Sequence, residues 1–257
     1  MTGVNGASAF AQVAAARIYN LIGKTDAAMA AFDKALAIKA DPGIYLNRAM
    51  TRPRTDVAGR EADADAALKL APAMIEAFTF KAGVQIDQGD FTGAIKTYSA
   101  ALEKEPENSG LLDGRGIAYA KAGDQSQADK DFAAARLKAT NEAMLNNLCW
   151  SKATNDVALE RALSECDAAL EKAPGSPAII DSRAFVLLRL GRIDEAIAAY
   201  DQVIAKSSGF PTSLFGRAVA WSRKGDPAKA KADFDAALKL NPQVQKEFAD
   251  YGVKYQP

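Results

Sequence analysis

Residues 89–106, GDFTGAIKTYSAALEKEP, decide the fold, because residues 225–242, GDPAKAKADFDAALKLNP, repeat their pattern far along the chain. Both stretches open on Gly-Asp and carry Ala five positions after the glycine and an aromatic ring nine positions after it. Gly can end one helix in the left-handed conformation, and Asp can begin the next by capping its free amides. The pattern therefore predicts a turn followed by an amphipathic helix.

The same helical unit occurs seven times along the chain. Its central position is occupied by Ala or Val, and after a first interval of 32 residues every later interval is 34. An aromatic ring usually stands three residues earlier, which is the same face of a helix. The central positions are Ala35, Ala67, Ala101, Ala135, Ala169, Val203 and Ala237.

A further helical stretch precedes most of these units, and it too carries a small residue. Small side chains at matched positions let two antiparallel helices approach closely, so each repeat is predicted to be a helix pair. The small residues of the preceding stretches are Ala16, Ala49, Ala82, Gly116, Ala184 and Ala218. Those of the following helices are Ala28, Ala94, Ala128, Ala162, Ala196 and Ala230.

This pattern resembles the tetratricopeptide repeat (TPR) over roughly residues 9 to 242. The resemblance implies an all-α fold, a right-handed superhelical solenoid of about seven helix-turn-helix repeats. The expected repeats are 9–41, 42–73, 75–107, 109–141, 142–175, 177–209 and 211–242, after a flexible N-terminus at 1–8. Residues 243–257 are expected to form a helix and tail that cap the open end of the stack.

Composition excludes several classes of function. The chain of 257 residues contains no His, which excludes Ser-His-Asp and Cys-His nucleophile pairs and His metal ligands. It has no phosphate-cradling glycine loop, and its 32 basic residues balance 32 acidic ones, so no net field attracts nucleic acid. It also lacks an apolar run of transmembrane length. We therefore expect no enzyme activity, no cofactor or metal, no nucleic-acid partner and no membrane insertion.

The resemblance also implies where a partner binds. In TPR proteins the first helices of the repeats line a concave groove, and their outward side chains contact the ligand. The slots lack the Lys, Asn and Arg clamp with which some family members hold a chaperone C-terminal tail, so that partner is disfavoured. An apolar pair flanked by two arginines suits instead a peptide with an apolar anchor and some acidic character. The expected groove residues include Asp113, Asp181, Phe185, Arg189, Phe215 and Arg223.

The fifth repeat departs from the 34-residue frame. Strict spacing places Trp150 in the small position, where an indole does not fit between closely packed helices. A shift of one residue, taken up near Asn155 and Asp156, places Cys149 in that position and turns Trp150 toward the groove as a binding anchor. Burial of Trp150 between repeats is the alternative.

Cys149 and Cys166 are the only cysteines, and they fall on the two helices of this repeat. Packed helix axes lie about 8 to 10 Å apart, whereas a disulfide needs Cα atoms within about 4.4 to 6.8 Å, so only a close pair qualifies. We expect a disulfide if the protein is exported. Two buried free thiols in a reducing cytosol are the alternative.

Basic residues also recur just before the small position of the first helix. Arg48, Arg115 and Arg217 are predicted to pair across the helices with Asp63, Asp131 and Asp233, each exposed pair contributing at most about 1 kcal/mol. Binding of an acidic peptide is the alternative role of this row.

The last hundred residues resemble a group of exported bacterial TPR proteins, through residues 148–150, 165–167, 181–185 and 246–252. That likeness implies a periplasmic or secreted bacterial protein, with the cytoplasm as the alternative. The function expected is a non-catalytic scaffold that binds a protein or peptide. A structural or self-association module, or a segment of a larger enzyme, is the alternative.

Overall fold

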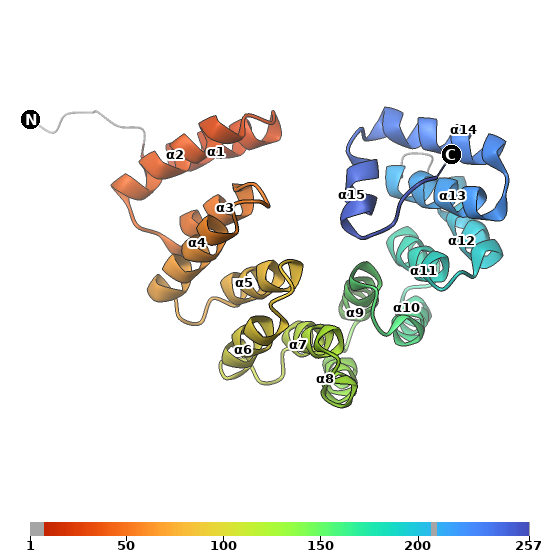
Figure 1. Cartoon of the computed structure of the whole chain (residues 1–257), viewed down its shortest axis with the longest axis horizontal. Coiled ribbons are helices and arrows are strands. Elements are labelled where there is room, and N and C mark those ends of the chain that lie inside the picture. The colour runs from red at the N-terminus through yellow and green to blue at the C-terminus, as the bar shows by residue number, and fades with distance from the viewer. Residues whose placement is uncertain (1–7, 207–209, 257) are drawn as a thin grey trace, which may run out of the picture. The chain divides into compact units, whose positions relative to one another are not determined.

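The computed structural model describes residues 8–206 and 210–256. These residues form helices joined by short turns, without any strand (Figure 1). Within these ranges every helix is too short or too polar to span a lipid bilayer. Nearly all of the expected flexible N-terminus, and the end of the expected sixth repeat at 207–209, lie outside the described residues.

Two units divide the chain, at Met1–Pro106 and Glu107–Pro257. In the described part of the first, the helices are α1 (Ala9–Leu21), α2 (Thr25–Ile38), α3 (Pro42–Thr51), α4 (Val57–Leu70), α5 (Ile75–Asp87) and α6 (Phe91–Leu102). Those of the second are α7 (Ser109–Ala122), α8 (Gln125–Lys138), α9 (Glu142–Asn155), α10 (Leu159–Lys172), α11 (Pro177–Arg189), α12 (Ile193–Lys206), α13 (Pro211–Lys224), α14 (Pro227–Leu240) and α15 (Val244–Asp250). The all-α arrangement of seven helix pairs and one further helix is therefore confirmed.

The turns inside the pairs form as their residues predict. Gly123 ends α7 with φ of 86°, a left-handed conformation that suits a residue without Cβ. The carboxylate of Asp124 then accepts a hydrogen bond from the backbone N–H of Gln127, which caps α8. Asp90 and Asp226 cap α6 and α14 in the same way.

Small residues hold the two helices of each pair together. The Ala residues expected at the contact are all fully buried, in the first helices as in the second. Gly116 of α7 shows how close the helices come, because a Cβ there would lie 2.7 Å from the ring of Phe132 on α8. The predicted close contact is confirmed.

The predicted row of ion pairs is also confirmed. Arg48, Arg115 and Arg217 each pair with the expected Asp of the second helix. Arg48 also binds Asp33, and Arg217 also binds Asp201, each on the second helix of the preceding pair. The row therefore links neighbouring repeats as well as paired helices.

These pairs are less exposed than the sequence suggests. The side chains of Asp131 and Asp233 are only 10% and 11% exposed. Removing the arginine therefore leaves a nearly buried carboxylate without its strongest donor, which costs more than the loss of a surface pair.

The α15 helix does more than cap the end of the stack. It contacts α13 and α14, but the ring of Phe248 also reaches Phe185 on α11, and the ring of Tyr251 reaches Trp150 on α9. The expectation of a simple end cap is therefore incomplete, because the aromatic side chains of this segment contact rings on three first helices of the second unit, α9, α11 and α13.

We expect Arg217→Ala to lower the free energy of unfolding of the second unit by about 1–3 kcal/mol, because Asp233 is left buried and unpaired. Arg183→Ala is the matched control: Arg183 sits at the same place in the preceding repeat, but its partner Asp167 is 49% exposed, so the loss should stay below about 1 kcal/mol. Urea unfolding followed by tryptophan fluorescence measures both. Equal losses would contradict the assigned role of burial.

Candidate functional site

The fifth helix pair departs from its neighbours at its turn. Asp156 and Ala158 adopt left-handed φ values of 58° and 47°, where the turns after α1, α5, α7, α11 and α13 use Gly. The pair α9 and α10 stays close nevertheless, because Cys149 is fully buried and bonded to Cys166. The disulfide spans a Cα–Cα distance of 5.4 Å, within the range of about 4.4 to 6.8 Å that the bond requires.

With Cys149 at the contact, Trp150 points toward the next helix pair. Its ring lies 5.3 Å from that of Phe185 on α11 and 5.6 Å, edge-on, from that of Tyr251. Trp150 is partly exposed, so it is not enclosed between the paired helices. This placement follows the one-residue shift that the sequence suggests; a role in binding stays a prediction.

Side chains of three first helices form one surface, which we call the aromatic face: Trp150 of α9, Phe185 and Arg189 of α11, and Phe215 and Arg223 of α13. Phe185 and Phe215 are 1% and 0% exposed. They are covered by Phe248 of α15, whose ring lies 5.5 Å and 4.7 Å from theirs. Five of the predicted groove residues thus lie on neighbouring helices, and part of their surface is already occupied by the chain itself.

The tail after α15 has no regular secondary structure and runs past α13 and α14. Val253 is buried and Tyr255 stacks on Phe234 at 4.4 Å, whereas Lys254 and Gln256 are exposed. The alternation is that of an extended segment held by every second side chain.

Two side chains of the first helices also bind main-chain carbonyls of this tail. Arg189 donates to the carbonyl of Tyr251, and Ser222 donates to that of Gln256. The tail is therefore held through its backbone as well as its side chains.

Arg189 is the most constrained charge of the aromatic face. Its side chain is 7% exposed, its guanidinium lies over the Phe185 ring, and its Nη1 is 3.2 Å from Asp156. Burial lowers its pKa from the usual range, and neighbouring Arg223 acts in the same direction. Its Nε atom is buried without a hydrogen-bond partner. Arg189 therefore retains one N–H donor that the chain's own groups leave unsatisfied.

Asp113 is enclosed and does not line an open groove, so that prediction is wrong for Asp113; for Asp181, which is only partly buried, a role in the groove stays a prediction. Asp181 accepts hydrogen bonds from Ser213 and Thr212 of α13, and burial raises its pKa. Asp113 is 2% exposed and pairs with Lys152. Both carboxylates join consecutive first helices, α11 to α13 and α7 to α9.

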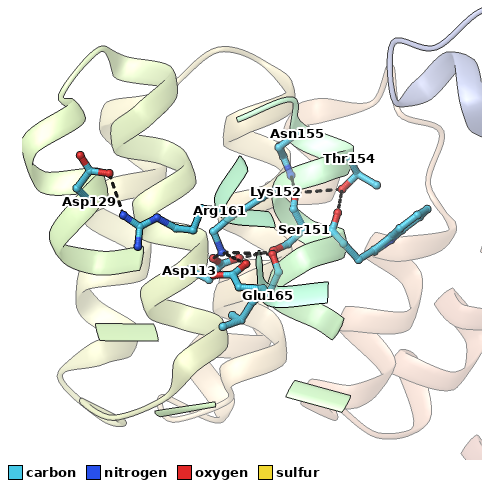
Figure 2. Close-up of polar contacts among 10 residues, drawn as sticks. Asp113, Asp129, Ser151, Lys152, Thr154, Asn155, Arg161 and Glu165 are labelled. Carbon is cyan, nitrogen blue, oxygen red and sulfur yellow. Dashed lines mark hydrogen bonds and ion pairs between the residues drawn. The ribbon is translucent and has the colours of Figure 1, made fainter. Parts of the chain in front are cut away.

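Figure 2 shows the cluster around Asp113. Lys152 of α9 is fully buried, and its ammonium group binds Asp113 of α7 and Glu165 of α10, the latter at 2.9 Å. The Ser151 hydroxyl also donates to Asp113. Three helices from two repeats therefore meet on one lysine, next to the disulfide.

One lysine cannot neutralise two buried carboxylates. Burial raises the pKa of Glu165 to about 7, against the attraction of Lys152, and Asp113 is shifted in the same direction for the same reason. One oxygen of Glu165 is buried without a partner. Lys152 and Glu165 are not among the site residues expected from the sequence. The available signal was their position, because Lys152 lies one helical turn after Cys149 and Glu165 directly precedes Cys166.

In the described residues no group of three or more His, Cys, Asp or Glu side chains is arranged to hold a metal ion. The cluster of Asp113, Lys152 and Glu165 is closed to solvent, so its place in the fold suits a structural role: it fixes α7, α9 and α10 against one another.

Comparisons with known proteins agree with this fold. Models described as tetratricopeptide repeat match residues 11–42, 81–143 and 183–244, together more than half of the chain. The intervals between these matches hold most of the second repeat, which contains the shorter interval of 32 residues, and most of the fifth, which departs from the 34-residue frame.

Among curated proteins, serine/threonine-protein phosphatase T of Trypanosoma brucei brucei is 32% identical over 79 residues, which are 30% of this chain and 17% of that protein. Among solved structures, yeast Tom70 superposes with a TM-score of 0.70 at 17% identity, covering 95% of this chain and 52% of Tom70. A repeat protein from Parabacteroides merdae gives a TM-score of 0.59 at 17% identity, covering 96% and 99%. At these identities the structures show the fold alone.

The raised pKa of Glu165 predicts an unusual pH dependence. Between pH 4.5, its ordinary pKa, and about 7, the folded chain holds a proton that the unfolded chain releases. The free energy of unfolding should therefore fall as pH rises through this window, by on the order of 2 kcal/mol. Urea unfolding at pH 5, 6 and 7.5 measures it.

Glu165→Gln should flatten this dependence, because the glutamine side chain does not titrate. Glu195→Gln, at an exposed carboxylate of α12 whose pKa is lowered by Arg192, should retain the wild-type profile. A wild-type protein more stable at pH 7.5 than at pH 5 would contradict the assignment.

Proposed function

The chain belongs to the tetratricopeptide repeat family, and on that basis we propose that it is a non-catalytic scaffold that binds a protein or peptide segment on its aromatic face. The repeat fold supports a protein-binding role. The face is placed on the first helices of the repeats, α9, α11 and α13, as expected for this family.

One observation carries the proposal: the aromatic face already holds a polypeptide segment. Residues 244–256 contact it through aromatic rings and through two carbonyl hydrogen bonds. Buried rings give a segment most of its binding energy, and hydrogen bonds to its backbone set its direction and register. A surface that binds one such segment has the chemistry to bind another.

The polar groups of the second unit support a role without catalysis. Lys152 is the only fully buried cation among the described residues and is enclosed with its two carboxylates, whereas Asp181 is bound to α13. A catalytic acid or base must be within hydrogen-bond reach of its substrate. Neither group is placed for that.

The disulfide supports a further proposal, that the protein works in an oxidising compartment such as the bacterial periplasm or the cell exterior. Disulfides persist there and are rare in a reducing cytosol. The bond closes a loop with a sequence separation of 17 and would stabilise the fold by about 3 kcal/mol in the chain-entropy model.

Thiol titration tests this proposal. We expect no reactive thiol in protein that is purified from the periplasm without reductant and then unfolded, because Cys149 and Cys166 are joined. The same protein after reduction provides the control, with both thiols reactive. Two reactive thiols before reduction would argue against the disulfide and the oxidising compartment together.

Binding to the aromatic face is tested with peptides selected on the full chain from a displayed random library. In a Trp221→Phe background, in which Trp150 is the only tryptophan, we expect a bound peptide to shift or quench the tryptophan fluorescence. In the matched Trp150→Phe background the remaining emission, from Trp221 on α13, should change far less. Trp150→Ala should weaken binding at least tenfold, and peptides that bind this variant as tightly as the wild type would rule out the face.

A further inference from the structure

Residues 244–256 rest on the aromatic face in the manner of a bound ligand, and we propose that they are a tethered occupant which a partner segment of similar but more acidic chemistry displaces. This inference rests on the proposed function and names the class of partner. The partner segment begins with a helical turn that carries two aromatic residues three positions apart. It continues in an extended conformation with an acidic residue where this chain has Lys254.

The helical part supplies the anchors. Phe248 and Tyr251 are three residues apart, so both rings project from one side of the segment. The Phe248 ring lies against Phe185 and Phe215, and the Tyr251 ring lies edge-on to Trp150 at 5.6 Å. Together they cover rings from α9, α11 and α13. A displacing segment needs aromatic side chains at the same two positions to regain these contacts.

The extended part is bound mainly through its backbone carbonyls. Arg189 and Ser222 bind the carbonyls of Tyr251 and Gln256, which every peptide offers. Val253 and Tyr255 face inward between these two points, and Tyr255 stacks on Phe234. Two carbonyls and two alternate side chains are therefore the requirements on this part of the partner.

One residue of the tethered segment, Lys254, interacts unfavourably with the face. Lys254 lines a small hollow together with Arg223, and the other side chains that line it, Val219, Ser222 and Gln256, carry no charge. Two like charges in one hollow weaken binding, whereas a carboxylate would be attracted to Arg223 and to the neighbouring Arg189. A partner segment with an acidic residue in place of Lys254 should therefore bind the face more tightly than the tethered segment does.

The attachment of the segment permits its release. The α15 helix has seven residues, and only Asn241–Gln243 connect it to α14. A helix this short is not stable by itself and depends on its contacts with the face. The short tether also gives the segment a high local concentration, on the order of millimolar, so a free ligand must outcompete it.

The experiment uses the full chain and two fluorescently labelled peptides. One has the sequence of residues 242–256, and the other has the same sequence with Lys254→Glu. Each is titrated by fluorescence anisotropy against the wild type, against Phe248→Ala and against Gln245→Ala. Phe248→Ala loosens the tethered segment, whereas Gln245 lies on the exposed side of the same helix and provides the control.

We expect Phe248→Ala to bind both peptides at least tenfold more tightly than the wild type and Gln245→Ala do. On Phe248→Ala, the Lys254→Glu peptide should bind about tenfold more tightly than the unchanged peptide, and this preference should disappear in the double variant with Arg223→Ala. Equal affinities of wild type and Phe248→Ala, or no preference for the acidic peptide, would overturn the inference.

Further arms separate the ways in which the inference could fail. If library-selected peptides bind the wild type through Trp150 but Phe248→Ala adds nothing, the tethered occupant is wrong and the proposed function stands. If Phe248→Ala binds neither peptide nor any library peptide, both the tethered occupant and the proposed function are wrong.

Should Phe248→Ala lose helicity, Tyr255→Ala replaces it, because Tyr255 lies in the tail beyond α15. A wild type that sediments as a dimer would identify a second copy as the occupant and overturn displacement within one chain.

Discussion

The close approach of paired helices at Ala and Gly is the constraint on which the rest of the structure depends. Every expected Ala contact is fully buried, and at Gly116 even a methyl group would collide with Phe132. Helices this close can place an Arg of the first helix against an Asp of the second, as Arg115 and Asp131 do. The close packing of small residues therefore makes the ion pairs between the helices geometrically possible.

The fifth pair shows what happens when a sequence cannot meet this constraint in the usual register. An indole does not fit at the contact, so Cys149 takes that place and Trp150 turns outward to Phe185. The turn then needs left-handed Asp156 and Ala158, which cost roughly 1–2 kcal/mol each for residues with a Cβ. The disulfide lies in the same pair and offsets that cost.

Much of the fold could be predicted from the sequence, because turns, small contacts and ring positions recur at a fixed spacing. Gly123 with Asp124, and Arg217 with Asp233, are local pairs that periodicity places correctly. The buried site around Lys152 could not be predicted in this way, because its partner Asp113 lies in another repeat and nothing in the period specifies it.

The aromatic face was predicted only in part, for a similar physical reason. Trp150, Phe185 and Phe215 come together as their helix positions suggest. What covers them depends on Phe248 and Tyr251, which lie beyond the last repeat and contact rings up to 101 residues earlier in the sequence. Asp113 was misplaced because a carboxylate on a first helix can face either a ligand or the next helix, and the pattern does not distinguish the two.

The position of the disulfide has a mechanical consequence. In a repeat array each pair contacts mainly its neighbours, so unfolding can begin at an end and spread pair by pair. In the second unit α9 and α10 are cross-linked and are also joined to α7 through Lys152, so this pair resists separation more than those on either side. Unravelling that starts at α14 is therefore arrested at α10, and the helices up to that point form the part of the unit that persists longest under tension or heat.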